Sequence, residues 1–130
     1  LEINQKLEKI IKKIKPEIVY TTPKNDLHKD HQIVFESTLI ATRPHSSKVK
    51  NIFSYEIPGV VKKPFFPTVY EDISKEISFK IKAFKSYKSE IEKFPHPRSI
   101  QSIETLSLHR GMESNLKNAE SFELIRSIRD

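Results

Sequence analysis

Residues 18–31 read Ile18-Val19-Tyr20-Thr21-Thr22-Pro23-Lys24-Asn25-Asp26-Leu27-His28-Lys29-Asp30-His31. The first four residues form a β-branched and aromatic run that is too short for a helix and is typical of a buried parallel strand. The last six hold two carboxylates and two imidazoles. Imidazole is the commonest metal ligand in proteins and titrates near neutral pH, so this density of His and Asp predicts metal binding or proton transfer. We therefore expect the chemistry of the chain directly after this strand.

Helix and strand patterns alternate on both sides of this stretch. Apolar residues at helical spacing predict an amphipathic helix before it, closed by Pro16, and a second helix from about residue 30 to residue 42. A strand is expected near residues 51–57, an irregular loop or lid at 58–72, and a last strand near 119–126.

Two more helices are expected between the loop and the last strand. The first is long, running past Ile73 to Ile91 with Asp72 or Ser74 as its N-cap. The second begins at Pro97 and ends at Gly111, which would act as a stop signal.

This alternation predicts an α/β fold with a mostly parallel sheet flanked by helices, and such sheets bind ligands beyond the carboxyl ends of their strands. His28 and His31 would stand three residues apart in the first turn of the second helix and project to the same side. Asp30 has a second reading as a helix cap, and Asp26 with Asn25 as a turn signal.

Composition limits the class of protein. The chain has 130 residues, about one domain, and a net charge of +6 that is spread thinly, so a solvated helix face is expected rather than a nucleic-acid partner. The absence of Cys excludes thiolate sites and suits a reducing cytosol, so a cytoplasmic protein is expected. No apolar stretch approaches the roughly 18 residues that span a membrane. Two Gly in the whole chain exclude a Gly-rich dinucleotide fingerprint.

Several motifs along the chain follow the order of a known family. They are Pro16-Glu17-Ile18-Val19-Tyr20-Thr21, Asn25 to His31, Ala41-Thr42-Arg43, Tyr55-Glu56-Ile57-Pro58, Phe66-Pro67-Thr68-Val69-Tyr70-Glu71-Asp72-Ile73, Lys82-Ala83 with Tyr87, Pro95-His96-Pro97-Arg98-Ser99, Arg110-Gly111 and Ala119-Glu120-Ser121-Phe122. In this order the chain resembles the zinc-dependent N-acetylglucosaminyl deacetylases of the PIG-L and LmbE type, which are hydrolases with a Rossmann-like fold.

The resemblance implies roles for the residues after the first strand. His31 would be one ligand of a single zinc, which polarises an N-acetyl carbonyl and lowers the pKa of water. His28 would stabilise the reacting carbonyl oxygen or protonate the leaving amine, and Asp30 would orient and charge that imidazole. The implied substrate is an N-acetylated amino sugar or glycoconjugate, and relatives often form homo-oligomers. Asp26 and Arg98 are further candidates for substrate binding, although a structural ion pair is as good a reading of Arg98.

The chain departs from the family in lacking its first metal motif, of the type His-Pro-Asp-Asp. No His or Asp precedes residue 16, and the single His-Pro, at His96-Pro97, is not followed by Asp. Residues 1–130 are therefore expected to be the C-terminal part of one deacetylase domain. The N-terminal half and the other zinc ligands would lie outside this chain, and an isolated chain would be inactive. The start at Leu1 rather than Met suggests that something upstream has been removed.

Two other classes of protein share features with this sequence. A non-catalytic interaction module could retain this half-fold and contact an anionic partner through the Lys-rich first helix. A phosphohydrolase of the HD type needs its central pair in the order His-Asp, whereas here Asp30 precedes His31.

Overall fold

The computed structural model describes residues 2–59 and 61–130 of this chain. Leu1, on which the expectation about the chain start rests, and Val60, inside the predicted loop, lie outside the described residues. The chain divides into two compact units. The first runs up to Thr68 and includes Phe122–Asp130, and the second is Val69–Ser121. Among the helices of the described residues, none has the length and apolar character needed to cross a membrane.

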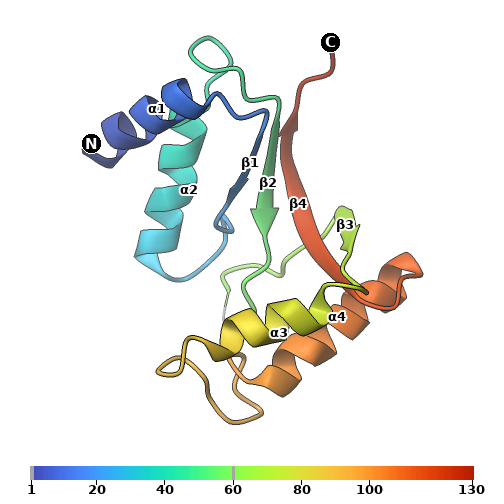
Figure 1. The fold of residues 1–130 in the computed structure, drawn as a ribbon. Helices are drawn as coiled ribbons and strands as arrows, with labels where there is room; N and C mark the ends of the chain where they lie inside the picture. Colours follow the sequence, from blue (N-terminus) through green and yellow to red (C-terminus); the bar gives the residue numbers. More distant parts are fainter. Residues whose placement is uncertain (1, 60) are drawn as a thin grey trace. The chain divides into compact units, whose positions relative to one another are not determined.

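The first unit begins with the three elements that the sequence predicts. Helix α1 is Glu2–Ile14, strand β1 is Ile18–Thr21 and helix α2 is Lys29–Ala41. Pro16 follows α1 as expected, and α1 packs on α2 beside β1 (Figure 1). At the other end of α2, the guanidinium of Arg126 donates a hydrogen bond to the Thr42 carbonyl, one of the groups that a helix end leaves without a partner.

The sheet has the strand order β1-β2-β4-β3, with β2 at Asn51–Tyr55, β3 at Val69–Asp72 and β4 at Ala119–Ser127. Strand β1 pairs with β2 in parallel, in the register Ile18↔Asn51, and β2 pairs with β4 antiparallel. The α/β class with helices packed beside a sheet is confirmed, and the sheet itself is mixed.

Strand β1 is parallel as predicted but is not buried. Ile18 is 48% exposed and Tyr20 54% exposed, whereas Thr21 on the α2 side is buried. Among the described residues β1 has a strand partner on one side only, and α2 covers only one of its faces. The other face carries Tyr20, which stacks on Phe53 at 5.5 Å between ring centroids and lies 5.1 Å from the Phe122 ring.

The buried face of α2 combines apolar residues with small polar ones. Phe35, Ser37, Thr38 and Ala41 are buried, while Ile33 is 40% exposed. The Thr38 hydroxyl lies 3.0 Å from the Thr21 hydroxyl, so strand and helix are joined by a buried hydrogen bond as well as by apolar contact.

The second unit differs from the sequence prediction in three places. The predicted loop 58–72 ends in strand β3. The predicted long helix is the short α3, Ile77–Lys85, with Glu76 at its N-cap position. It starts later than predicted because Asp72 accepts the Ser74 backbone N–H at 2.9 Å and so closes a turn before the helix instead of capping it. Ile73 is buried ahead of α3, and Ile91 lies beyond it.

Helix α4, Ile100–Ser114, begins and ends later than predicted. Its first residue is Ile100 rather than Pro97, and Ser99 is its N-cap, since the Ser99 hydroxyl accepts the Ser102 backbone N–H at 3.0 Å. The helix runs through Gly111 and stops at Asn115, which adopts a left-handed conformation at φ 57°. Gly111 serves close packing instead, because a Cβ there would lie 2.5 Å from the Leu116 carbonyl oxygen.

We expect Gly111→Ala to destabilise the protein by about 2 kcal/mol, because the backbone after α4 must move to admit a methyl group. Urea unfolding followed by circular dichroism measures the loss. The matched control is Gln101→Ala at an exposed position of the same helix, which should stay within about 0.5 kcal/mol of the parent. Equal stabilities of the two variants would show that the backbone around Leu116 yields freely.

Candidate metal centre

The loop between β1 and α2 is held by hydrogen bonds on both sides. At its start, the Ser54 hydroxyl of β2 donates to the Thr22 carbonyl at 2.8 Å, and the Thr22 hydroxyl donates to the His31 carbonyl at 2.7 Å. Further along, Asp26 forms an isolated antiparallel bridge with Val61. The carboxyl end of β1 and the first turn of α2 are therefore joined directly, and the loop has little freedom to move.

Asp26 lies at the centre of this loop and is only 2% exposed. Its Oδ1 accepts the His28 backbone N–H at 2.8 Å and lies 2.8 Å from His28 Nδ1, while Oδ2 lies 2.8 Å from His31 Nδ1. The Gln32 side-chain amide donates to the Asp26 carbonyl at 2.7 Å. One buried carboxylate thus holds both imidazoles.

The two rings differ in their access to solvent. The side chain of His28 is 75% exposed and that of His31 is 34% exposed. Their ring centroids are 5.0 Å apart. Within the described part of the chain, the hydrogen bonds of both rings go through Nδ1, so each Nε2 is available to a ligand. Asp26, His28 and His31 also offer ligand atoms within 4.8 Å of one another, a spacing suited to a metal ion.

The surroundings of Asp26 keep its carboxylate ionised. Burial raises its pKa, but the hydrogen bonds from the His28 backbone N–H and from both imidazoles outweigh burial and lower the pKa from 3.8 to about 2. The cluster therefore holds a negative charge at neutral pH, next to two groups that can carry a proton or donate electrons to a metal.

The structure brings together His28, His31 and Asp26 of the residues that the sequence singled out. His28 occupies the N-cap position of α2, where Ser, Thr, Asp or Asn is usual, and its side chain makes no capping hydrogen bond. The imidazole is thus placed for contact with Asp26 rather than for capping.

Asp30 and Arg98 lie elsewhere. Asp30 is exposed in the first turn of α2, and its side chain makes no hydrogen bond or ion pair within the described residues. Arg98 belongs to the second unit, where its guanidinium pairs with Glu90 and its backbone N–H donates to His96 Nδ1 at 3.0 Å. The roles given to Asp30 and Arg98 stay predictions. His45 and His109 lie at exposed positions outside the cluster.

Sequence reasoning missed the double contact of Asp26 and the part played by Gln32. The available signal was the spacing Asp-x-His, because an Asp side chain reaches the backbone N–H two residues on. That signal finds the turn and the His28 contact. The contact between Asp26 and His31 forms because the first turn of α2 lies against the loop. No local sequence pattern predicts that arrangement.

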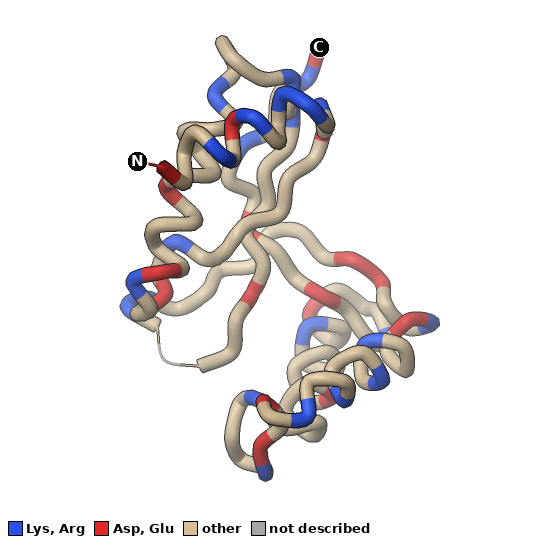
Figure 2. The backbone as a smooth tube through the Cα atoms, turned by 60° about the vertical axis from the view of Figure 1, so that its left-hand side comes forward, with Lys and Arg blue, Asp and Glu red and all other residues tan. Residues whose placement is uncertain are grey.

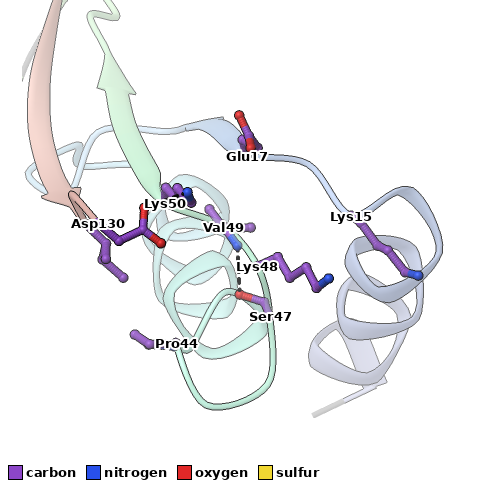
Figure 3. A pocket seen from close by; sticks show the side chains of 9 residues that line it. Lys15, Glu17, Pro44, Ser47, Lys48, Val49, Lys50 and Asp130 are labelled. Atoms are coloured by element: carbon purple, nitrogen blue, oxygen red, sulfur yellow. Dashed lines mark hydrogen bonds and ion pairs between the residues drawn. The ribbon is translucent and has the colours of Figure 1, made fainter.

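A separate concave region lies at the opposite, amino-terminal ends of β1 and β2 (Figure 3). Its volume is about 430 Å³, and it is lined by Lys15, Glu17, Pro44, Ser47, Lys48, Val49, Lys50, Ile128 and Asp130. Lys50 pairs there with Asp130 at 2.7 Å. None of the sequence-predicted site residues lines this region.

Searches of protein-family models and of curated proteins found no match to this chain. Solved structures do share its fold. The conserved protein TT1542 from Thermus thermophilus has a TM-score of 0.80 at 20% identity, over 99% of this chain and 60% of that chain. GalB, the 4-carboxy-2-hydroxymuconate hydratase from Pseudomonas putida, has a TM-score of 0.76 at 15% identity, over 99% of this chain and 60% of that one.

The fold is also similar to that of N,N'-diacetylchitobiose deacetylase from Pyrococcus horikoshii, with a TM-score of 0.72 at 17% identity. This match covers 96% of this chain and 51% of the deacetylase. The present chain thus spans about 60% of the length of the first two structures and about half of the third. At these identities the likeness shows a shared α/β fold, which occurs in proteins that carry out different reactions.

The lowered pKa of Asp26 predicts a specific loss of stability in acid. A carboxyl with a folded-state pKa of about 2 and an unfolded value near 3.8 stabilises the fold above about pH 4. We expect about 2 kcal/mol of this stabilisation to be lost as the pH falls from about 4 to about 2. Urea unfolding at several pH values, compared with Asp26→Asn, isolates the effect because other acidic groups are common to both proteins. If the free energy of unfolding depended on pH in the same way in both proteins, the prediction would be wrong.

Proposed function

We propose that this chain is the C-terminal part of a zinc-dependent hydrolase that removes acetyl from an N-acetylated amino sugar or glycoconjugate. The observation that carries the proposal is the Asp26, His28 and His31 cluster at the carboxyl end of β1, with both Nε2 atoms available. The shared fold with a chitobiose deacetylase supports it. In α/β sheets this edge of the strands is where ligands bind.

The two imidazoles of this cluster could supply part of the ligand set of a catalytic zinc. Zinc accepts imidazole nitrogen, and a catalytic zinc usually has three protein ligands and one open position. His31 is the more enclosed ring and is the proposed ligand. The remaining ligands, a His and an Asp, and the carboxylate that acts as base would lie in an N-terminal half outside this chain. The isolated chain is therefore expected to bind zinc weakly and to be inactive.

When bound, zinc would polarise the acetyl carbonyl and lower the pKa of water. The reaction cleaves the amide C–N bond, and water supplies a hydroxyl group to the acetate and a proton to the amine. His28 is open to a substrate on its Nε2 side, and its Nε2 would take up that proton and pass it to the leaving nitrogen. Asp30, an exposed carboxylate in the first turn of the same helix, is proposed to assist His28 in this transfer.

The proposal also includes a cellular location and an oligomeric state. We place the enzyme in the cytoplasm, because the chain has no Cys and so needs no oxidising compartment. We also expect homo-oligomers, as in relatives of the deacetylase family.

An interaction module is the second candidate, and one observation favours it. Helix α1 has no buried residue, and its charged side chains are four Lys and two Glu, whereas basic and acidic segments are interspersed in the second unit (Figure 2). An anionic partner could use this surface. Zinc content separates the two candidates, because the module has no need of a metal.

In the complete protein, we expect one zinc per chain, lost in His31→Ala because a ligand is removed. His28→Ala should keep the zinc and lower turnover by about a hundredfold or more, because it removes the proton donor. Elemental analysis measures the metal, and acetate release from N-acetylglucosamine or diacetylchitobiose measures turnover.

His45→Ala is the matched control, an exposed imidazole outside the cluster, and should change neither quantity. A complete protein without zinc and without acetate release would end the deacetylase proposal in favour of the interaction module. Unchanged turnover in His28→Ala would remove His28 from the mechanism alone.

A further inference from the structure

We propose that Asp26 is a positioning residue that fixes the tautomer of both imidazoles, with the proton on Nδ1, so that His28 and His31 both present Nε2 outward. Only the destination of the Nε2 atoms, metal for His31 and substrate for His28, rests on the proposed function. The tautomers themselves follow from contacts within this chain.

The numbers of hydrogen-bond donors and acceptors in the cluster determine the tautomers. A neutral imidazole has one N–H and one nitrogen with a lone pair, while an ionised carboxylate can only accept. Each Nδ1 lies 2.8 Å from its own oxygen of Asp26, so each ring must donate through Nδ1. The carboxylate has two oxygens for two rings, and both rings are therefore held in the same tautomer.

Asp26 is suited to this role because it is itself fixed in place. It is almost fully buried, its Oδ1 also accepts the His28 backbone N–H, and its carbonyl accepts the Gln32 amide. Rotation of the carboxylate would break its hydrogen bonds with the His28 backbone N–H and with both imidazoles. An acceptor that cannot move defines the direction of the ring that donates to it.

The same three residues could instead bind a metal directly, since their ligand atoms lie within 4.8 Å. Such a site would use an oxygen of Asp26 or the Nδ1 atoms, and these atoms already hydrogen-bond one another. Asp26 is also less accessible than either ring. The geometry therefore favours Asp26 behind the rings rather than beside them as a ligand.

Nitrogen NMR on the complete protein, at a pH high enough to keep imidazoles neutral, tests the tautomers without any metal or substrate. The expected result is a protonated Nδ1 and an unprotonated Nε2 in both His28 and His31. His28→Gln and His31→Gln assign the signals among the five His of this chain. An unprotonated Nδ1 in both rings of the parent protein would overturn the proposal, and this measurement needs no variant of Asp26.

Asp26→Asn is the decisive substitution because an amide has one acceptor oxygen where the carboxylate has two. At least one ring should then lose the fixed Nδ1–H tautomer. Glu36→Gln, an exposed carboxylate on the same helix, is the matched control and should leave both rings unchanged. If Asp30→Asn changes the rings and Asp26→Asn does not, Asp30 holds the positioning role and the proposal is wrong.

Zinc ion added to the metal-free protein gives a second measurement. We expect the Nε2 signal of His31 to shift, and Asp26→Asn to weaken zinc affinity by about 10- to 100-fold, the scale for losing a group that orients a ligand. A shift at Nδ1 instead would show direct ligation beside Asp26 and overturn the proposal. A protein that binds no zinc yet shows both Nδ1–H tautomers would uphold the inference and count against the proposed hydrolase, so the two failures are distinct.

Discussion

The carboxylate of Asp26 is the group on which the geometry of the candidate site depends. Burying an ionised carboxylate costs several kcal/mol unless hydrogen bonds and opposite charge offset it. Here one backbone N–H and two imidazoles provide the offset, and each of those donors sits on the loop or on the first turn of α2. The buried Asp26 carboxylate needs these hydrogen-bond donors. This one requirement constrains both the path of the chain from β1 to α2 and the directions of the two rings.

The parallel pairing of β1 with β2 places this carboxylate at the edge of the sheet. The Ser54 hydroxyl reaches across from β2 to the Thr22 carbonyl, and the Thr21 hydroxyl meets that of Thr38 on α2. These buried hydroxyls replace apolar contacts in a chain whose hydrophobic content is only 36%. Because hydrogen bonds are directional, they hold the end of β1 and the start of α2 in one arrangement, which an apolar interface of the same size would define less sharply.

The spacing of apolar residues predicted the helices and strands whose limits depend on nearby residues. It failed where residues distant in the sequence determine where a helix ends or which side chain is exposed. The limits of α1, β1 and α2 follow from apolar spacing and Pro16, and the cluster lies after β1 as predicted. The prediction of a helix end at Gly111 was wrong, because a glycine that makes room for the Leu116 carbonyl has the same local signature as a stop. The exposure of Tyr20 depends on which strands and helices lie beside β1, and composition does not report that.

The difference in solvent exposure between the His28 and His31 rings suits them to different chemical roles. A metal ligand gains from enclosure, because a less hydrated site strengthens its electrostatic contacts, whereas a proton donor must reach a substrate that enters and leaves. His31 has less than half the exposed fraction of His28, and both share one carboxylate. In the proposed zinc site His31 would supply one of the three protein ligands that a catalytic zinc usually has, so two further ligands are needed beside it. The His and Asp that we propose outside this chain would meet that need, and they would leave His28 free for the substrate.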